Sequence, residues 1–122
     1  MTIQELYQNI GGDYDQAIRV LRVDKLVDKH IRKFSKNGVV ENLLNAEDSM
    51  DPTELFEAAH AMKGVCANLG LVNLSNAASE ICEEFRPGNV RRLSDGEIKE
   101  RLQTVRDMYK RTTDYIRIYE EL

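Results

Sequence analysis

The sequence predicts an all-α protein, and two patterns carry that prediction. Apolar residues return at intervals of three and four along almost the whole chain, which is the period of a helix with one buried face. No stretch alternates apolar and polar residues for long enough to indicate a β-strand. Because 122 residues suit one hydrophobic core, we expect a single domain over residues 1–122.

The first part of the chain is predicted to form short helices with marked ends. One segment ends at Gly11-Gly12, and Asp13 is suited to cap a second. Asp24 is suited to cap a longer helix that stops near Asn37-Gly38, and one more short helical piece follows. The apolar residues that mark these four segments are Ile3, Leu6, Tyr7 and Ile10, then Ala17, Ile18 and Leu21, then Val27, Ile31 and Phe34, and finally Val39, Val40, Leu43 and Leu44.

A central helix has the best-marked start. Asp51, Pro52 and Glu54 stand where a helix takes an N-cap, an N1 proline and an N3 glutamate, each of which satisfies or tolerates amide groups that a helix start leaves unpaired. We expect this helix to run to Gly70. Its core-facing stripe is predicted to consist of Leu55, Ala59, Met62, Cys66 and Leu69.

Two further helices follow. Asn73 or a neighbour starts a helix with Leu74, Ala78, Ile81 and Phe85 on one stripe, and Pro87-Gly88-Asn89 ends it. Ser94 and Glu97 match a capping box at the start of the last helix. Its apolar and aromatic seam is Ile98, Leu102, Val105, Tyr109, Thr112, Ile116 and Tyr119.

The connections predict the arrangement of these helices. Short loops after Phe34, Leu69 and Phe85 favour antiparallel neighbours. We therefore expect an antiparallel up-down-up-down four-helix bundle, with the short N-terminal helices across one end.

Charge argues against nucleic acid as a partner. The formal net charge is −4, whereas binding to a phosphate backbone needs a basic field. Residues 19–36 hold seven basic and two acidic residues, and residues 41–84 hold one basic and nine acidic residues. Pairing of helices within a bundle explains this segregation at least as well as a docking role does.

The sequence also predicts a soluble cytoplasmic protein. No segment approaches the roughly 20 apolar residues of a membrane span, and the first twenty residues are too polar for an export signal. Cys66 and Cys82 lie inside helical patterns and lack the spacing of a metal site or a disulfide framework. We expect two buried thiols in a reducing compartment, no metal, no cofactor and a monomer.

The central helix carries the residues with chemical potential. His60 lies roughly 120–140° from the centre of the core-facing stripe, so its imidazole is predicted to project from the flank of the bundle. One and two turns further along the same face are Gly64 and Ala67, and Lys63 is adjacent. Because glycine inside a helix costs about 1 kcal/mol relative to alanine, Gly64 needs a reason. Close approach by another molecule is one, and close helix packing is the alternative.

These residue types suit phosphoryl transfer. An imidazole has an unperturbed pKa of about 6.5, so one ring nitrogen keeps a free lone pair near neutral pH and can attack phosphorus. The ammonium of Lys63 could offset the charge of a phosphate on His60, although it could also be an ordinary solvated side chain. No phosphate-binding loop, acidic metal cluster or second base accompanies the histidine. We therefore expect a phosphocarrier, not an enzyme, with the metal and remaining catalytic groups supplied by its partner.

The sequence resembles the histidine-containing phosphotransfer (HPt) domain family. The family pattern His-x-x-Lys-Gly, followed by small residues and Leu-Gly, is matched by His60, Lys63, Gly64, Asn68, Leu69 and Gly70. The resemblance also takes in the Gly12-Asp13-Tyr14 lead-in and Leu74, Ser75 and Ala78, so it covers most of the chain.

The resemblance implies a particular role for these residues. The phosphoryl group would sit on the outer ring nitrogen of His60 and pass to or from an aspartate in a magnesium-containing receiver domain, of a response regulator or a hybrid histidine kinase. Lys63 and Gly64 would stabilise the phosphate or give access, and Ala67 and Asn68 would face the partner. Since neither a kinase nor a receiver sequence accompanies the pattern, we expect a separate carrier in a phosphorelay.

Two alternatives remain open on sequence grounds. Glu57 and His60 form a Glu-x-x-His pair, a spacing that di-iron carboxylate bundles use twice. The other histidine, His30, has Val27 at the required position, which disfavours such a site. The second alternative is a helical bundle that binds a receiver or another regulator through the same face without being phosphorylated.

Overall fold

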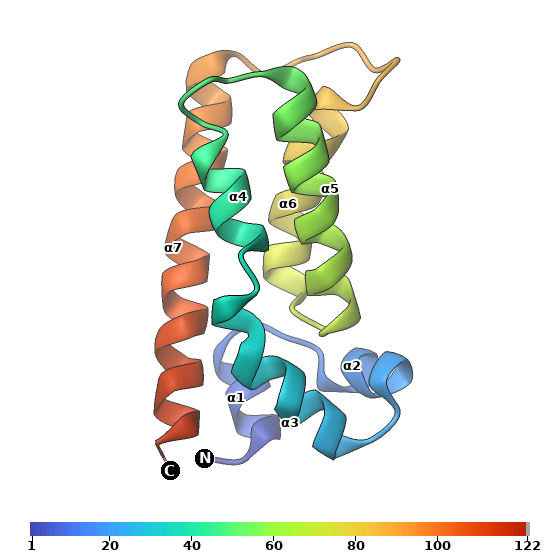
Figure 1. The fold of residues 1–122 in the computed structure, drawn as a ribbon, viewed down its shortest axis with the longest axis vertical. Helices are drawn as coiled ribbons and strands as arrows, with labels where there is room; N and C mark the ends of the chain where they lie inside the picture. Colours follow the sequence, from blue (N-terminus) through green and yellow to red (C-terminus); the bar gives the residue numbers. More distant parts are fainter. Residues whose placement is uncertain (122) are drawn as a thin grey trace.

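The computed structural model describes residues 1–121, and every regular element in that range is helical (Figure 1). The all-α prediction is therefore confirmed. Seven α-helices and one 3-10 turn follow one another along the chain. They are α1 Ile3–Asn9, α2 Tyr14–Leu21, α3 Asp24–Lys33, η1 Phe34–Lys36, α4 Val39–Asn45, α5 Pro52–Asn68, α6 Val72–Phe85 and α7 Asp95–Glu120.

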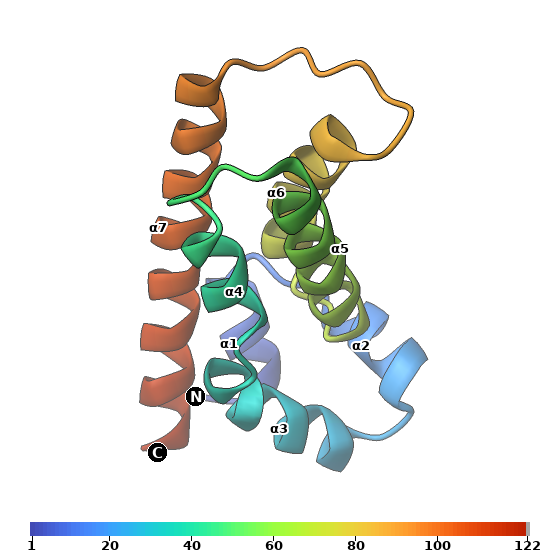
Figure 2. The ribbon, with the colours of Figure 1, turned by 45° about the horizontal axis from the view of Figure 1, so that its top comes forward.

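Helices α4 to α7 form the bundle that carries the predicted site. Helix α5 packs against α4 and α6, and α7 contacts both α4 and α6 on the other side. In Figures 1 and 2 the chain reverses its direction from each of these helices to the next. Helix α1 packs against α7, and α2 packs against α3 and α5. The N-terminal helices therefore lie at the end of the bundle where α5 ends.

The predicted helix after residue 24 stops near Asn37-Gly38 as expected, and its last turn is a 3-10 turn. Helix α3 ends at Lys33, η1 continues it for one turn, and Gly38 separates η1 from α4. Gly38 has φ of 88°, a left-handed conformation that interrupts a helix and is open chiefly to glycine. As a result it is α4 that packs against α5 and beside α7.

The predicted caps are confirmed at three helices and wrong at one. The side chains of Asp13, Asp51 and Ser94 accept hydrogen bonds from backbone amides at the starts of α2, α5 and α7. Asp24, in contrast, is the first helical residue of α3, and the N-cap residue is Val23. The Asp24 carboxylate accepts a hydrogen bond from the Tyr14 hydroxyl of α2, so a tertiary partner has replaced the local amide.

The hydrophobic core draws on every α-helix. The predicted stripe of α5 is confirmed: Leu55, Ala59, Met62 and Cys66 are fully buried and Leu69 is nearly so. They meet buried residues of the neighbouring helices, among them Leu43 of α4, Leu74, Ala78 and Ile81 of α6, and Ile98, Leu102 and Val105 of α7. Burial of this stripe fixes the rotation of α5, and therefore decides which of its residues face outward.

The N-terminal helices hold the C-terminal end of α5. The Tyr7 hydroxyl donates to the Leu69 carbonyl oxygen at 2.7 Å, and the Gln16 amide donates to the Ala67 carbonyl oxygen at 2.8 Å. The backbone N–H of Asp13 donates to the Gly70 carbonyl oxygen at 2.7 Å. Carbonyl groups at the end of a helix have no partner within the helix, so α1 and α2 supply partners that α5 itself lacks.

Within residues 1–121 no helix combines the length and the apolar character needed to cross a membrane.

Candidate functional site

The predicted histidine lies on the outward flank of α5. His60 is exposed, and Lys63, three residues later, is half-buried. Gly64 is exposed, and a Cβ atom built on it would meet no atom within 4 Å outside its own helix turn. Close helix packing is therefore not the reason for this glycine. The structure brings His60, Lys63 and Gly64 together on one open surface.

Ala67 and Asn68 extend this surface in different ways. Ala67 is half-buried where α5 meets α2, and its carbonyl oxygen is the one that accepts from Gln16. Asn68 is exposed and lines a pocket of about 260 Å³ that also contains Val20 and His30. Since Asn68 is eight residues after His60, it is rotated by roughly 80° about the axis of α5. Asn68 therefore lies toward the adjoining flank, on which His30 is exposed.

Two residues that the sequence did not single out contact the imidazole directly. The ring of Phe56, one turn earlier on α5, is stacked on His60 with centroids 5.7 Å apart and planes 20° apart. The Sγ atom of Cys82, on α6, lies 4.0 Å from His60 Nδ1. Nδ1 therefore faces the neighbouring helix, and the other ring nitrogen, Nε2, is the one on the outer side of the ring.

Arg86 links both of these neighbours. Its guanidinium lies over the Phe56 ring, with 5.4 Å between Cζ and the ring centroid, and its Nη2 atom is 3.8 Å from Cys82 Sγ. A salt bridge of 2.9 Å to Glu83 holds the guanidinium from the other side. Arg86 is thus fixed at the end of α6 beside the histidine.

Lys63 and Arg86 bring positive charge to the Cys82 side of His60, and Glu83 brings a negative charge. Burial raises the pKa of the Cys82 thiol, and the positive charges of Arg86 and Lys63 partly oppose that rise. The hydrogen bond from Arg86 lowers the pKa of Glu83, and the charge of Lys63 contributes to the same effect. The ammonium of Lys63 therefore acts on the end of α6 that faces His60, and among the described residues no carboxylate lies within 4 Å of it.

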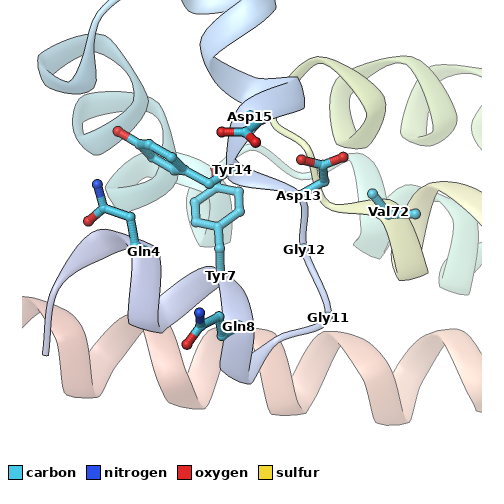
Figure 3. A pocket seen from close by; sticks show the side chains of 9 residues that line it. All are labelled: Gln4, Tyr7, Gln8, Gly11, Gly12, Asp13, Tyr14, Asp15 and Val72. Atoms are coloured by element: carbon cyan, nitrogen blue, oxygen red, sulfur yellow. The ribbon is translucent and has the colours of Figure 1, made fainter.

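A pocket of about 560 Å³ lies elsewhere, between α1 and the start of α2 (Figure 3). Tyr7 and Tyr14 meet there edge to face, with ring centroids 5.3 Å apart. None of the predicted site residues lines this pocket. His60 and Gly64 therefore lie on an open surface, as suits a macromolecular partner.

The residues near His60 do not resemble a di-iron site. Such a site needs several carboxylates and two histidines that converge in the core of a bundle. Across residues 1–121 there is no group of three or more His, Cys, Asp or Glu side chains arranged to hold a metal ion.

Comparison with known proteins identifies the family. The family model of the Hpt domain matches residues 36–112, which is more than half of the chain and includes the whole of α5 and α6. The chain therefore belongs to the Hpt domain family, and the resemblance seen in the sequence is confirmed. Searches of curated proteins and of solved structures found no match.

Membership of this family fixes the broad function. Hpt domains act in phosphotransfer in two-component signal transduction, and they are phosphocarriers rather than enzymes. Their partners in a phosphorelay are receiver and kinase domains.

Phe56 and Cys82 thus contact His60, Arg86 joins the two, and the sequence singled out none of these three for the site. Phe56 could have been noticed, because it is four residues before His60 and so shares its face. Cys82 comes from α6, and Arg86 directly follows that helix. Their proximity depends on how far α6 is shifted along α5, for which the sequence carries no direct signal.

Proposed function

We propose that this protein is a phosphorelay intermediate that accepts a phosphoryl group on His60 and exchanges it with an aspartate of a receiver domain. One observation carries the proposal: within the matched family region, His60 is exposed on α5, with its Nδ1 atom toward α6 and open space at Gly64. This geometry leaves Nε2 as the nitrogen that a partner can reach.

The proposed step is a direct transfer between two nucleophiles. The Nε2 lone pair attacks phosphorus, a P–N bond forms, and the P–O bond to the partner's aspartate breaks as that aspartate leaves as a carboxylate. Transfer in the other direction reverses these changes. Lys63 would offset the negative charge of the phosphate, and the receiver would supply its magnesium ion and the other groups that polarise the phosphoryl oxygens.

The same proposal includes the extent of the domain, its oligomeric state, its compartment and its partner. Residues 1–122 would form one Hpt domain that works as a monomer in the cytoplasm, where it would meet a response regulator or a hybrid histidine kinase. Gly64 would leave room for the receiver, and Ala67 and Asn68 would contact it. The single hydrophobic core that α1 to α7 share supports the assignment of one domain.

Replacement of His60 by glutamine tests the proposal. Because His60 is exposed, the variant is expected to keep the fold, yet acid-labile labelling by a phosphorylated receiver domain should be lost. His30→Gln is the matched control, since His30 is also an exposed helical histidine, and its labelling should be unchanged. Labelling that persists in His60→Gln would contradict the proposal.

The same experiment addresses the non-phosphorylated interaction module. If the unaltered chain binds a phosphorylated receiver but acquires no acid-labile phosphate from it, the protein acts by binding alone. Phosphate that maps to His60 would exclude that alternative.

A further inference from the structure

The side chains of Phe56, Arg86 and Cys82 form a closed ring of contacts with the imidazole of His60. His60 is stacked on Phe56, Phe56 lies under the guanidinium of Arg86, Arg86 contacts Cys82, and Cys82 contacts His60 Nδ1. His60 and Phe56 come from α5, Cys82 comes from α6, and Arg86 directly follows α6. Each side chain thus has two neighbours in the ring.

The chemistry of Cys82 determines what it can do for the histidine. Its side chain is fully buried, and burial raises the pKa of the thiol, so the sulfur remains protonated near neutral pH. A guanidinium has only donors, so toward Arg86 the sulfur can act only as an acceptor. Sulfur has a second lone pair, and His60 Nδ1 is the other polar atom beside it.

We infer that Cys82 is a positioning residue for His60: its sulfur accepts a hydrogen bond from Nδ1–H and thereby leaves Nε2 unprotonated and nucleophilic. A neutral imidazole carries one proton, and the hydrogen bond that one nitrogen makes decides which nitrogen holds it. The opposite arrangement, in which S–H donates to Nδ1, would place the proton on Nε2 and block attack. This inference rests on the proposed function of His60.

The position of that proton matters in both directions of transfer. When Nε2 attacks, the P–N bond forms, the P–O bond to the donor breaks, and the positive charge that develops on the ring is held by the proton already on Nδ1. When the phosphoryl group leaves, the P–N bond breaks and its electron pair returns to Nε2. Because Nδ1 has kept its proton, the leaving group is neutral imidazole, which is a far better leaving group than imidazolate.

Arg86 and Glu83 support the sulfur from the far side. The salt bridge between them and the hydrogen bond from the Asn89 amide to the Glu83 carbonyl oxygen, at 2.9 Å, fix the end of α6. Arg86 therefore directs one lone pair of Cys82 away from the histidine and leaves the other facing it. The tautomer of His60 is thus set by α6, although the histidine belongs to α5.

The tautomer can be measured without phosphotransfer. Nitrogen-15 NMR of the His60 side chain in the full chain should show Nδ1–H as the major neutral form, and Cys82→Ala should reduce its share. Cys82→Ser keeps an acceptor and should restore it. Cys66→Ala is the control, because Cys66 is equally buried on α5 and its thiol, with a pKa raised by burial to about 12, has no contact with His60 among the hydrogen bonds of the described residues.

Phosphorylation by phosphoramidate, a small donor, gives the second measurement. Cys82→Ala should slow labelling of His60 by about three- to tenfold, as loss of one weak hydrogen bond predicts, while Cys82→Ser and Cys66→Ala should differ little from the unaltered chain. Melting temperatures, compared with that of Cys66→Ala, show whether loss of a buried sulfur has changed the fold itself.

Three results would overturn the inference. They are Nε2–H as the major form in the unaltered chain, an unchanged tautomer ratio in Cys82→Ala, or a lower share of Nδ1–H in Cys82→Ala that Cys82→Ser does not restore. The last would mean that the volume of the sulfur, and not its lone pair, holds the ring. Failure of the proposed function looks different. In that case phosphoramidate labels His60 in none of the proteins, whereas the tautomer ratios still report on Cys82.

Discussion

Two glycines of the same sequence pattern have opposite surroundings in this protein. Gly64 lies in the middle of α5, and a Cβ atom there would meet open space. Gly70 lies two residues beyond the end of α5 with φ of 68°, and a Cβ atom there would come within 2.2 Å of the Asp13 carbonyl oxygen. One glycine faces outward from the molecule and the other faces inward.

The difference separates what the pattern does for the fold from what it does for a partner. At Gly70 the backbone conformation and the closeness of Asp13 both require the absence of a side chain, because the chain must turn there and dock on the N-terminal segment. At Gly64 nothing inside the protein requires it. We therefore propose that the reason for Gly64 lies outside the chain, in access for a partner, whereas Gly70 serves the fold.

The largest effect on stability is expected at Gly70. Gly70→Ala would place a Cβ atom in a left-handed conformation and against a backbone oxygen that cannot move aside freely. We expect a loss of roughly 3 kcal/mol in the free energy of unfolding. Thermal and urea unfolding measure this loss.

Gly96→Ala is the matched control, because a Cβ atom there would meet only Ser94 Oγ at 3.9 Å. This substitution should be neutral or slightly stabilising. Equal stability of the two variants would mean that the Gly70 turn can rearrange at little cost.

Gly64→Leu should move stability and function in opposite directions. On helix propensity alone the substitution should stabilise α5 by somewhat under 1 kcal/mol. The leucine side chain would stand one turn from His60, where the receiver must approach, so receiver-dependent transfer should fall by roughly tenfold or more, the effect of about 1.4 kcal/mol in the barrier. The melting temperature and the transfer rate are the two measurements.

Gly64→Ala is the control for this prediction, since it makes most of the same gain in helix propensity with far less bulk. Its transfer rate should lie between those of the unaltered chain and Gly64→Leu. Phosphoramidate is small enough to reach His60 in all three proteins. A stable Gly64→Leu variant that exchanges phosphate with a receiver at the normal rate would show that access does not depend on this position.

The contrast between the glycines also shows which structural features the sequence predicts and which it does not. Periodicity and caps located the helices, and the stripe of α5 predicted which way His60 points, because those signals act within a few residues. The outward angle of Gly64 followed from the same stripe. The contact of Gly70 with Asp13 did not, because it joins segments far apart in the chain. The prediction that Asp24 caps its helix was wrong for a similar reason, since its partner Tyr14 lies on another helix.

The same limit applies to the site. His60, Lys63 and Gly64 were predicted from spacing on one helix, whereas Cys82 contacts the imidazole from α6 and Arg86 contacts Cys82 from just beyond α6. Packing of Leu55, Ala59 and Met62 against α6 sets the register between the two helices, and many registers satisfy an apolar stripe equally well. A residue pattern along one helix therefore points to the proposed phosphoacceptor more readily than to the residues that contact it from elsewhere in the chain.

The smallest effect is expected at Lys63, which directly precedes Gly64 in the sequence. Its ammonium has no carboxylate within 4 Å among the described residues, so Lys63→Ala should change the free energy of unfolding by less than about 0.5 kcal/mol. A phosphate on His60 would provide the partner that the ammonium lacks. Because the pair would be exposed, its loss should lower the transfer rate or the phosphohistidine lifetime by only about two- to fivefold.

Lys63→Arg keeps the charge and should behave like the unaltered chain. Added salt should reduce the difference in transfer rate or lifetime between Lys63→Arg and Lys63→Ala. If the alanine and arginine variants show the same rate and lifetime as the unaltered chain, Lys63 is a solvated surface residue, and the positive charge beside the phosphate must then come from Arg86 or from the partner.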